Sequence, residues 1–108
     1  MQVLYAFTGG SDGNQPYGGL VRGDGGKLLG TASMGGSTNC PDGCGTVYEL
    51  TPKPNQSPWT ESTLYEFEGI TGGAFPPSSL LRDGDSMFGV TEGGGLYDAG
   101  TLFRITAH

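Results

Sequence analysis

The sequence has few bases, one histidine and no long apolar run. It contains five Lys or Arg residues against eleven Asp or Glu residues, which gives a formal net charge of −6. A nucleic-acid surface needs a basic stripe, so we expect no nucleic-acid partner. No run approaches the roughly 18 apolar residues of a membrane-spanning helix, so we expect no membrane span. The sequence contains no basic segment that is followed by an apolar one, so we expect no signal peptide in it.

Segments that could form an α-helix are also scarce. The 108 residues include 22 Gly and 7 Pro, and few windows of ten residues lack both. Both residues disfavour helix interiors, so helix is nearly excluded. A composition this rich in Gly and Pro would indicate disorder if the sequence contained no internal repeat. A period is present, however, and the composition therefore predicts an acidic, all-β repeat protein.

Two parts of the sequence match each other in blocks that occur in the same order. The offset between matched residues falls from 60 to 59 to 55, and the losses fall in a turn and a loop. A duplicated structural unit leaves this pattern. The matched blocks are 3–7 with 63–67, Pro16 with Pro76, 19–22 with 79–82, 28–30 with 87–89, and 45–51 with 100–106.

Each unit contains four strand candidates, and we treat residues 1–108 as one domain of two repeats. Alternating Thr, Tyr, Phe and Val residues predict half-buried strands, and Asp-Gly pairs predict hairpin turns. Repeat 1 covers about 8–67, and repeat 2 covers about 68–108. The strands are expected near 18–22, 27–33, 45–51 and 59–67, then near 78–82, 86–91 and 100–106, with 2–7 as the remaining copy.

Repeated units of four antiparallel strands are typical of β-propeller blades. A solenoid of hairpins is the alternative. The order of the strands favours the propeller, because the second blade lacks an outer strand and residues 2–7 are a spare one. Two blades cannot close a ring, since propellers use about four to eight. We therefore predict a homo-oligomer closed by exchange of strand 2–7, most simply a trimer with six blades, with dimer and tetramer as alternatives.

The repeated blocks resemble the GloVer extracellular tandem-repeat family. They read Leu-Tyr-x-Phe, Gly-Ser-Asp-Gly-x-x-Pro-Tyr-x-Gly-Leu, Leu-x-Gly-Thr and Gly-Thr-Val-Tyr-Glu-Leu-Thr-Pro. The resemblance covers nearly the whole chain, and the second repeat departs from it at 68–74. It implies a β-propeller-like fold and a bacterial protein that is extracellular or at the cell surface. It implies no particular reaction.

Acidic residues gather in the loops that a propeller would place at one end. The loops 8–16, 33–45, 68–77 and 91–99 hold five acids and no Lys or Arg. A ring of such loops focuses negative potential at a channel mouth, although a solvated rim explains the charge equally well. Aromatic residues nearby suit sugar stacking or loop anchoring. The candidate ligand-binding residues are Asp12, Asn14, Tyr17, Asp42, Phe75, Glu92, Tyr97 and Asp98.

A Ca²⁺ site is a candidate in the first of these loops. Ser11, Asp12 and Asn14 offer hydroxyl, carboxylate and amide oxygens on a Gly-rich frame, which are the ligands that Ca²⁺ prefers. The spacing is not that of an EF-hand. A plain Asp-Gly turn is the alternative explanation.

Cys40 and Cys44 are the only cysteines. A structural zinc site needs four ligands, and a redox pair needs two intervening residues rather than three. A disulfide that closes a short loop is the leading interpretation, and it fits an extracellular compartment.

Two classes of function remain. The first is an extracellular binding and assembly module for a glycan or another polar ligand at the acidic channel mouth. The second is a Ca²⁺-dependent hydrolase of the lactonase or esterase type at the same place, which rests on analogy with other propellers. His108, the only histidine, lies at the last position and is expected to be a frayed end rather than a catalytic base.

Overall fold

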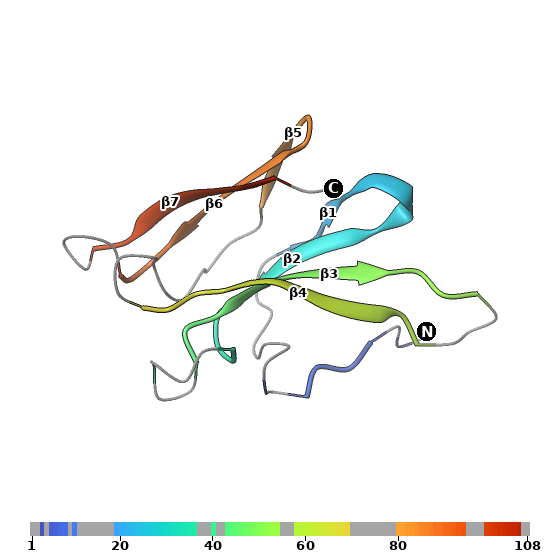
Figure 1. Ribbon diagram of the computed structural model, residues 1–108, viewed down its shortest axis with the longest axis horizontal. Helices are drawn as coiled ribbons and strands as arrows, with labels where there is room; N and C mark the ends of the chain where they lie inside the picture. The colour runs from blue at the N-terminus through green and yellow to red at the C-terminus, as the bar shows by residue number, and fades with distance from the viewer. Residues whose placement is uncertain are drawn as a thin grey trace.

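The computed structural model describes residues 3, 5–8, 10, 19–36, 40, 43–54, 58–69, 80–94 and 99–106 (Figure 1). This part of the chain contains seven β-strands, one short 3-10 turn and no α-helix. It has no helix with the length and hydrophobicity of a membrane span. The all-β prediction is therefore confirmed.

The strands form two separate antiparallel sheets (Figure 1). The first sheet contains β1 (Val21–Arg22), β2 (Leu28–Ala32), β3 (Thr46–Thr51) and β4 (Thr60–Glu66), in chain order. The second sheet contains β5 (Leu81–Asp83), β6 (Ser86–Thr91) and β7 (Thr101–Thr106), also in chain order. Neither sheet closes on itself.

Among the described residues of the N-terminal segment, Val3 and residues 5–8 lie in no assigned β-strand. The prediction that residues 2–7 pair with a neighbouring copy is not tested by a single chain and stays a prediction. Each sheet nevertheless has the strand order expected of a repeat unit, with three equivalent strands in both and a fourth in the first sheet alone.

The two matched hairpins differ in their turns. Asp83 pairs with Ser86, so only two residues connect β5 to β6, and Gly84 adopts a φ of +62°. This is the expected tight turn, because glycine accepts positive φ without a steric penalty. The connection from β1 to β2 is longer and contains the 3-10 turn η1 (Asp24–Gly26). The drop in the repeat offset from 60 to 59 corresponds to this difference.

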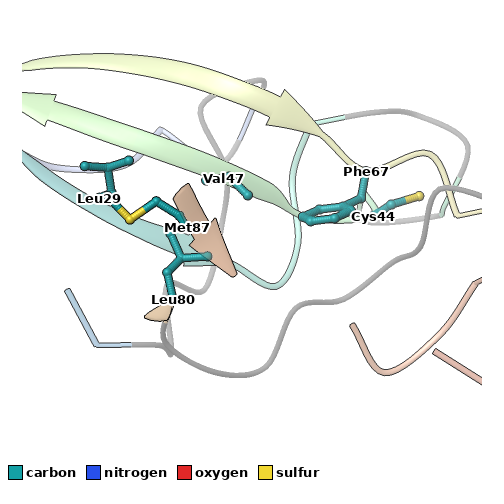
Figure 2. Close-up of a cluster of buried hydrophobic side chains, with 6 residues drawn as sticks. All are labelled: Leu29, Cys44, Val47, Phe67, Leu80 and Met87. Atoms are coloured by element: carbon teal, nitrogen blue, oxygen red, sulfur yellow. The ribbon is translucent and has the colours of Figure 1, made fainter. Parts of the chain in front are cut away.

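The main hydrophobic core lies between the two sheets (Figure 2). Leu29 and Val47 come from the first sheet, and Met87 comes from the second. Leu29 and Val47 project from the same side of the first sheet, because β2 and β3 pair Leu29 with Glu49 and Thr31 with Val47. The buried members of this cluster are Leu29, Cys44, Val47, Phe67, Leu80 and Met87.

A second core covers the opposite side of the first sheet. Its buried residues are Ala32, Tyr48 and Leu50, which alternate with the residues that face the second sheet. Tyr5 and Phe7 of the N-terminal segment pack against them, together with Leu28 and Trp59. The first sheet is therefore covered on both sides.

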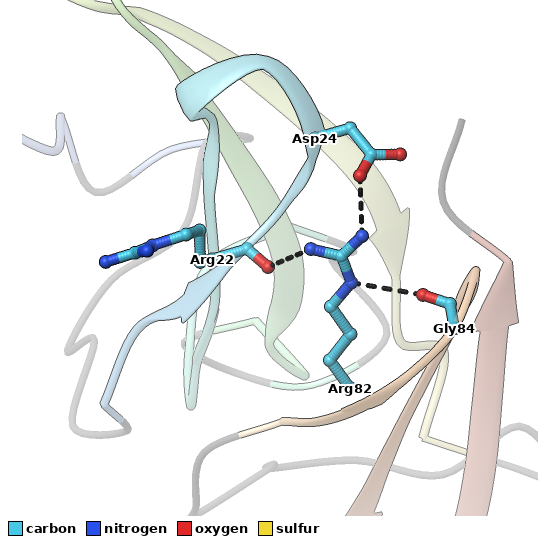
Figure 3. A network of polar contacts seen from close by, with 4 residues as sticks. All are labelled: Arg22, Asp24, Arg82 and Gly84. Carbon is cyan, nitrogen blue, oxygen red and sulfur yellow. Dashed lines mark hydrogen bonds and ion pairs between the residues drawn. The ribbon is translucent and has the colours of Figure 1, made fainter.

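An arginine links the two sheets at their hairpin turns (Figure 3). Arg82 Nη1 donates to the Arg22 carbonyl at 2.8 Å, and Arg82 Nη2 lies 2.5 Å from Asp24 Oδ1. Arg82 Nε also donates to the Gly84 carbonyl at 3.0 Å, which fixes the direction of the guanidinium. Because both side chains are partly exposed to solvent, this contact adds little stability by itself, and the core between the sheets contributes more to their placement.

Candidate functional site

Most of the residues predicted to bind a ligand lie outside the described residues. Glu92 is the exception, and it is exposed directly after β6. The remaining members of that set stay predictions. They are Asp12, Asn14, Tyr17, Asp42, Phe75, Tyr97 and Asp98, and Ser11 of the candidate Ca²⁺ site also lies outside the described residues.

Two loops that were predicted to lie at the same end of the unit do contact each other. The Gly36 N–H donates to the Gly10 carbonyl at 3.0 Å, which joins the loop after residue 8 to the loop after β2. The Gly45 N–H donates to the Gly35 carbonyl at 3.1 Å and closes the base of the second of these loops. These bonds bring Gly10 next to Gly36, at the described ends of the two loops.

The second repeat closes its corresponding loop in the same way. The Gly100 N–H donates to the Gly94 carbonyl at 3.1 Å. Thr91 Oγ1 lies 2.7 Å from Thr101 Oγ1, accepts from the Thr101 N–H at 3.0 Å, and donates to the Gly93 carbonyl at 3.0 Å. This network holds the start of the loop that follows β6, where Glu92 is exposed.

The two cysteines form the expected disulfide. Cys40 and Cys44 are bonded, with Cα atoms 5.2 Å apart. The Gly43 N–H donates to the Cys40 carbonyl at 3.0 Å, and Gly43 adopts a φ of +86°. Cys44 is fully buried in the main core. The disulfide therefore ties the loop after β2 to the core between the sheets.

The described residues contain no cluster of the side chains that most often bind metals. Within those ranges, no group of three or more His, Cys, Asp or Glu side chains is close enough to hold a metal ion. Glu68 and Glu92 are exposed there and both follow a strand at the loop end. The Ca²⁺ prediction depends on residues 11–14 and stays a prediction.

One side of the second sheet is an exposed apolar surface. Leu102 is 75% exposed and Leu81 is 69% exposed, and both project from the side that faces away from the first sheet. Their matched residues in the first repeat behave differently, since Val47 is 0% exposed between the sheets. We call this surface the open face, and its residues are Leu81, Phe88, Val90, Leu102 and Arg104.

A groove lies between the end of β4 and β7. In the described ranges β7 pairs with β6 and with no other strand. The groove has a volume of ≈ 250 Å³. Its lining residues come from β7 and from the end of β4, and they are Tyr65, Phe67, Phe103, Arg104 and Ile105.

The sequence predicted the missing outer strand but did not identify the open face or the groove. The match between the repeats could have identified the open face, because the apolar residues Leu102 and Leu81 align with the apolar residues Val47 and Val21. These positions remain apolar in both repeats, which is unusual for a side that faces water.

Comparison of the chain with protein-family models, with curated proteins and with solved structures gives no match. The function therefore has to be inferred from the sheets, the loops and the open face.

Proposed function

We propose that the chain is a GloVer-type β-propeller repeat unit that assembles with copies of itself into an extracellular binding module. The observation that supports this proposal is a contact that occurs twice. Phe67 stacks edge-to-face on Phe103 of β7 with ring centroids 5.1 Å apart, and Tyr65 stacks edge-to-face on Phe67 at 5.1 Å. This trio joins the last strand of the first repeat to the second sheet.

An equivalent trio occurs one repeat earlier. Phe7 stacks edge-to-face on Tyr48 of β3 at 4.8 Å, and Tyr5 stacks edge-to-face on Phe7 at 5.1 Å. Tyr5, Phe7 and Tyr48 are the residues that match Tyr65, Phe67 and Phe103 in the sequence. Both units therefore receive the same contact from the segment that precedes them, as consecutive blades of a propeller would.

Assembly follows from the number of units. Propellers use about four to eight blades, and this chain supplies two candidate blades. A trimer would give six, so we rank the trimer before the dimer and the tetramer. Stacked repeats bury a common core that a single unit cannot bury, and the open face is an apolar surface available for such stacking.

The ligand end of the module would be the end where the loops meet. The bond between Gly10 and Gly36 joins two of the acidic loops, and Glu68 and Glu92 are exposed at the ends of strands. Repeated around a ring, these carboxylates would favour a polar ligand such as a glycan, with Ca²⁺ reducing their mutual repulsion. A disulfide between Cys40 and Cys44 is compatible with the extracellular compartment of this proposal.

Light scattering combined with binding assays tests this function. We expect a mass of two or more chains, binding to a subset of a glycan array, and a higher melting temperature in millimolar Ca²⁺ than in chelator, because a ligand of the folded state stabilises it. The Asp12→Ala variant should lose the effect of Ca²⁺. A folded monomer of 11.1 kDa would contradict the assembly. An oligomer that binds no glycan and no cation would contradict the binding function.

The hydrolase alternative places a Ca²⁺-dependent ester or lactone reaction at the same loop end. No arrangement among the described side chains favours it over binding. The hydrolase can be distinguished from the binding module by an activity assay. A hydrolase should turn over ester or lactone substrates only in the presence of Ca²⁺, and the Asp12→Ala variant should lose this activity.

A further inference from the structure

We infer that the groove between the end of β4 and β7 binds a small aromatic carboxylate, that is, a ligand of one or two planar rings that carry a carboxylate group. The groove shares no residue with the acidic loops of the proposed function, and the inference goes beyond that function without depending on it. Two observations support it. An aromatic side chain packs at the matched place in the first repeat, and a matched acidic residue is replaced by an arginine in the second.

The groove combines a buried aromatic ring with more accessible ones. Phe67 is 1% exposed, whereas Tyr65 is 40% exposed and Phe103 is half-buried. Tyr65 and Phe103 each stand edge-to-face against Phe67, with ring centroids 5.1 Å apart in both contacts. A further ring suits such a wall, because aromatic pairs favour edge-to-face and offset-stacked arrangements.

The volume of the groove limits the size of the ligand. Its ≈ 250 Å³ correspond to about eight water molecules at roughly 30 Å³ each. Sites for drug-sized ligands enclose about 300–1,000 Å³. The groove therefore suits a ligand of one or two rings better than a chain of sugars.

The second core, on the first sheet, shows what packs at the matched place. Six of its seven described members align with residues of the second repeat, and the seventh is Trp59, with which no residue of this sequence aligns at the repeat offsets. The six aligned pairs are Tyr5 with Tyr65, Phe7 with Phe67, Leu28 with Met87, Ala32 with Thr91, Tyr48 with Phe103, and Leu50 with Ile105.

The groove thus corresponds to a wall on which the first repeat packs an indole ring. Trp59 is half-buried and packs against the cluster of Ala32, Tyr48 and Leu50. Four of the five residues that line the groove are counterparts of residues in this second core. A planar apolar ring is therefore the ligand part that fits the groove, and its removal from water favours binding.

The charge of the ligand follows from Arg104, the fifth lining residue. Arg104 aligns with Glu49, whose Oε1 atom lies 3.6 Å from Lys27 Nζ. Lys27 aligns with Ser86, so the second repeat replaces an acid–base pair with an arginine and a neutral residue. Arg104 forms no ion pair with any described residue. A carboxylate complements it, because a guanidinium donates two parallel hydrogen bonds to a carboxylate.

Titration calorimetry with indole-3-acetate as the probe tests the role of the charge. Arg104→Gln should raise the dissociation constant of indole-3-acetate by about tenfold or more, because a hydrogen bond between charged groups is lost. The same variant should leave the dissociation constant of indole, which has no carboxylate, within about twofold. Arg22→Gln is the matched control, because it removes the same charge from an exposed arginine outside the groove, and it should change neither constant by more than about twofold.

A second pair of variants tests the aromatic wall. Tyr65→Ala should raise the dissociation constants of indole-3-acetate and of indole together, by about threefold to tenfold, because both ligands lose a ring contact. Leu64→Ala removes a neighbouring β4 side chain that is 37% exposed and does not line the groove. It should leave both constants within about twofold.

The outcomes decide the inference separately from the proposed function. Binding that is weakened by Arg104→Gln and Tyr65→Ala but by neither control supports the site. Absence of saturable binding at millimolar indole-3-acetate overturns it, as do equal effects of a variant and its control. Tighter binding of galacturonate than of indole-3-acetate overturns the aromatic class of ligand. Titrations in chelator exclude the proposed Ca²⁺ site, so none of these results bears on the oligomer or on the acidic loops.

Discussion

The two sheets have the same strand order and matched sequences, but their surroundings differ. The first sheet is covered by the second sheet on one side and by residues 5–7 on the other. Among the described residues, the second sheet is covered on one side only, by the first sheet. Leu102 is 75% exposed on its other side, whereas Val47 is fully buried at the matched position. The two sheets thus share a pattern of apolar residues but differ in what covers them.

The difference in burial between the two matched positions, Val47 and Leu102, is tested most strongly by placing a negative charge at each of them. Val47→Asp should abolish cooperative unfolding, because an unpaired buried carboxylate costs several kcal/mol and can exceed the stability of a small domain. Leu102→Asp should retain the circular dichroism of a β-protein while the mass from light scattering falls to one chain. Two variants with the same behaviour in both measurements would contradict the difference in cover.

The next largest effect is expected at two matched glycines that lie under aromatic rings. A methyl group at Gly89 would come 2.5 Å from Phe103 Cζ, and one at Gly30 would come 2.6 Å from Tyr48 Oη. Gly89→Ala and Gly30→Ala should each lower the free energy of unfolding by about 1–3 kcal/mol. Urea denaturation measures both losses. A loss in only one repeat would show that the two cross-strand contacts are not equivalent.

A smaller and opposite pair of effects is expected at two matched threonines. Among the described residues, Thr46 Oγ1 is buried without a hydrogen-bond partner, whereas Thr101 Oγ1 shares a hydrogen bond with Thr91. The residue that matches Thr91 in the first repeat is Ala32. Thr46→Val should therefore raise the free energy of unfolding by about 1 kcal/mol, and Thr101→Val should lower it by a similar amount. Changes of the same sign in thermal melting would contradict this assignment.

The smallest effect appears only at alkaline pH. Burial, reinforced by the charge of Glu61, raises the pKa of Tyr48 above its ordinary value of 10.0. The folded state therefore binds the phenol proton more tightly than the unfolded state. This contribution to stability is complete below the ordinary pKa and is lost as pH rises above it.

Tyr48→Phe provides the matched variant, because Phe103 occupies the equivalent position in the second repeat. Its urea midpoint should fall less between about pH 9 and about pH 11 than that of the parent chain. Parallel pH profiles would show that Tyr48 does not contribute to the alkaline loss.

The sequence predicted the strands more fully than their environment. Gly45 and Gly100 precede β3 and β7, and the alternating residues after them identified both strands almost to the residue. The Asp-Gly pair before Asp85 identified a tight turn. These features depend on local backbone preferences, which a sequence carries directly.

The contacts between sheets could not be predicted in the same way. Arg22 and Arg82 are identical in type and in local pattern, yet only Arg82 has a neighbouring sheet within the chain to bind. The exposure of the open face likewise depends on contacts between sheets, which the local pattern of residues does not encode. The acidic loops are a different case, because most of their candidate residues, including Asp12 and Asp98, lie outside the described residues and remain predictions.

The free edge of β7 also affects how the native protein would form. If residues 3–7 of another copy complete this edge, the last step of folding is a bimolecular encounter whose rate rises with chain concentration. Until that encounter, the same edge and the apolar Leu102 beside it remain available to any extended segment. Refolding yield should therefore pass through a maximum with concentration, because productive pairing is too slow below it and non-specific association prevails above it.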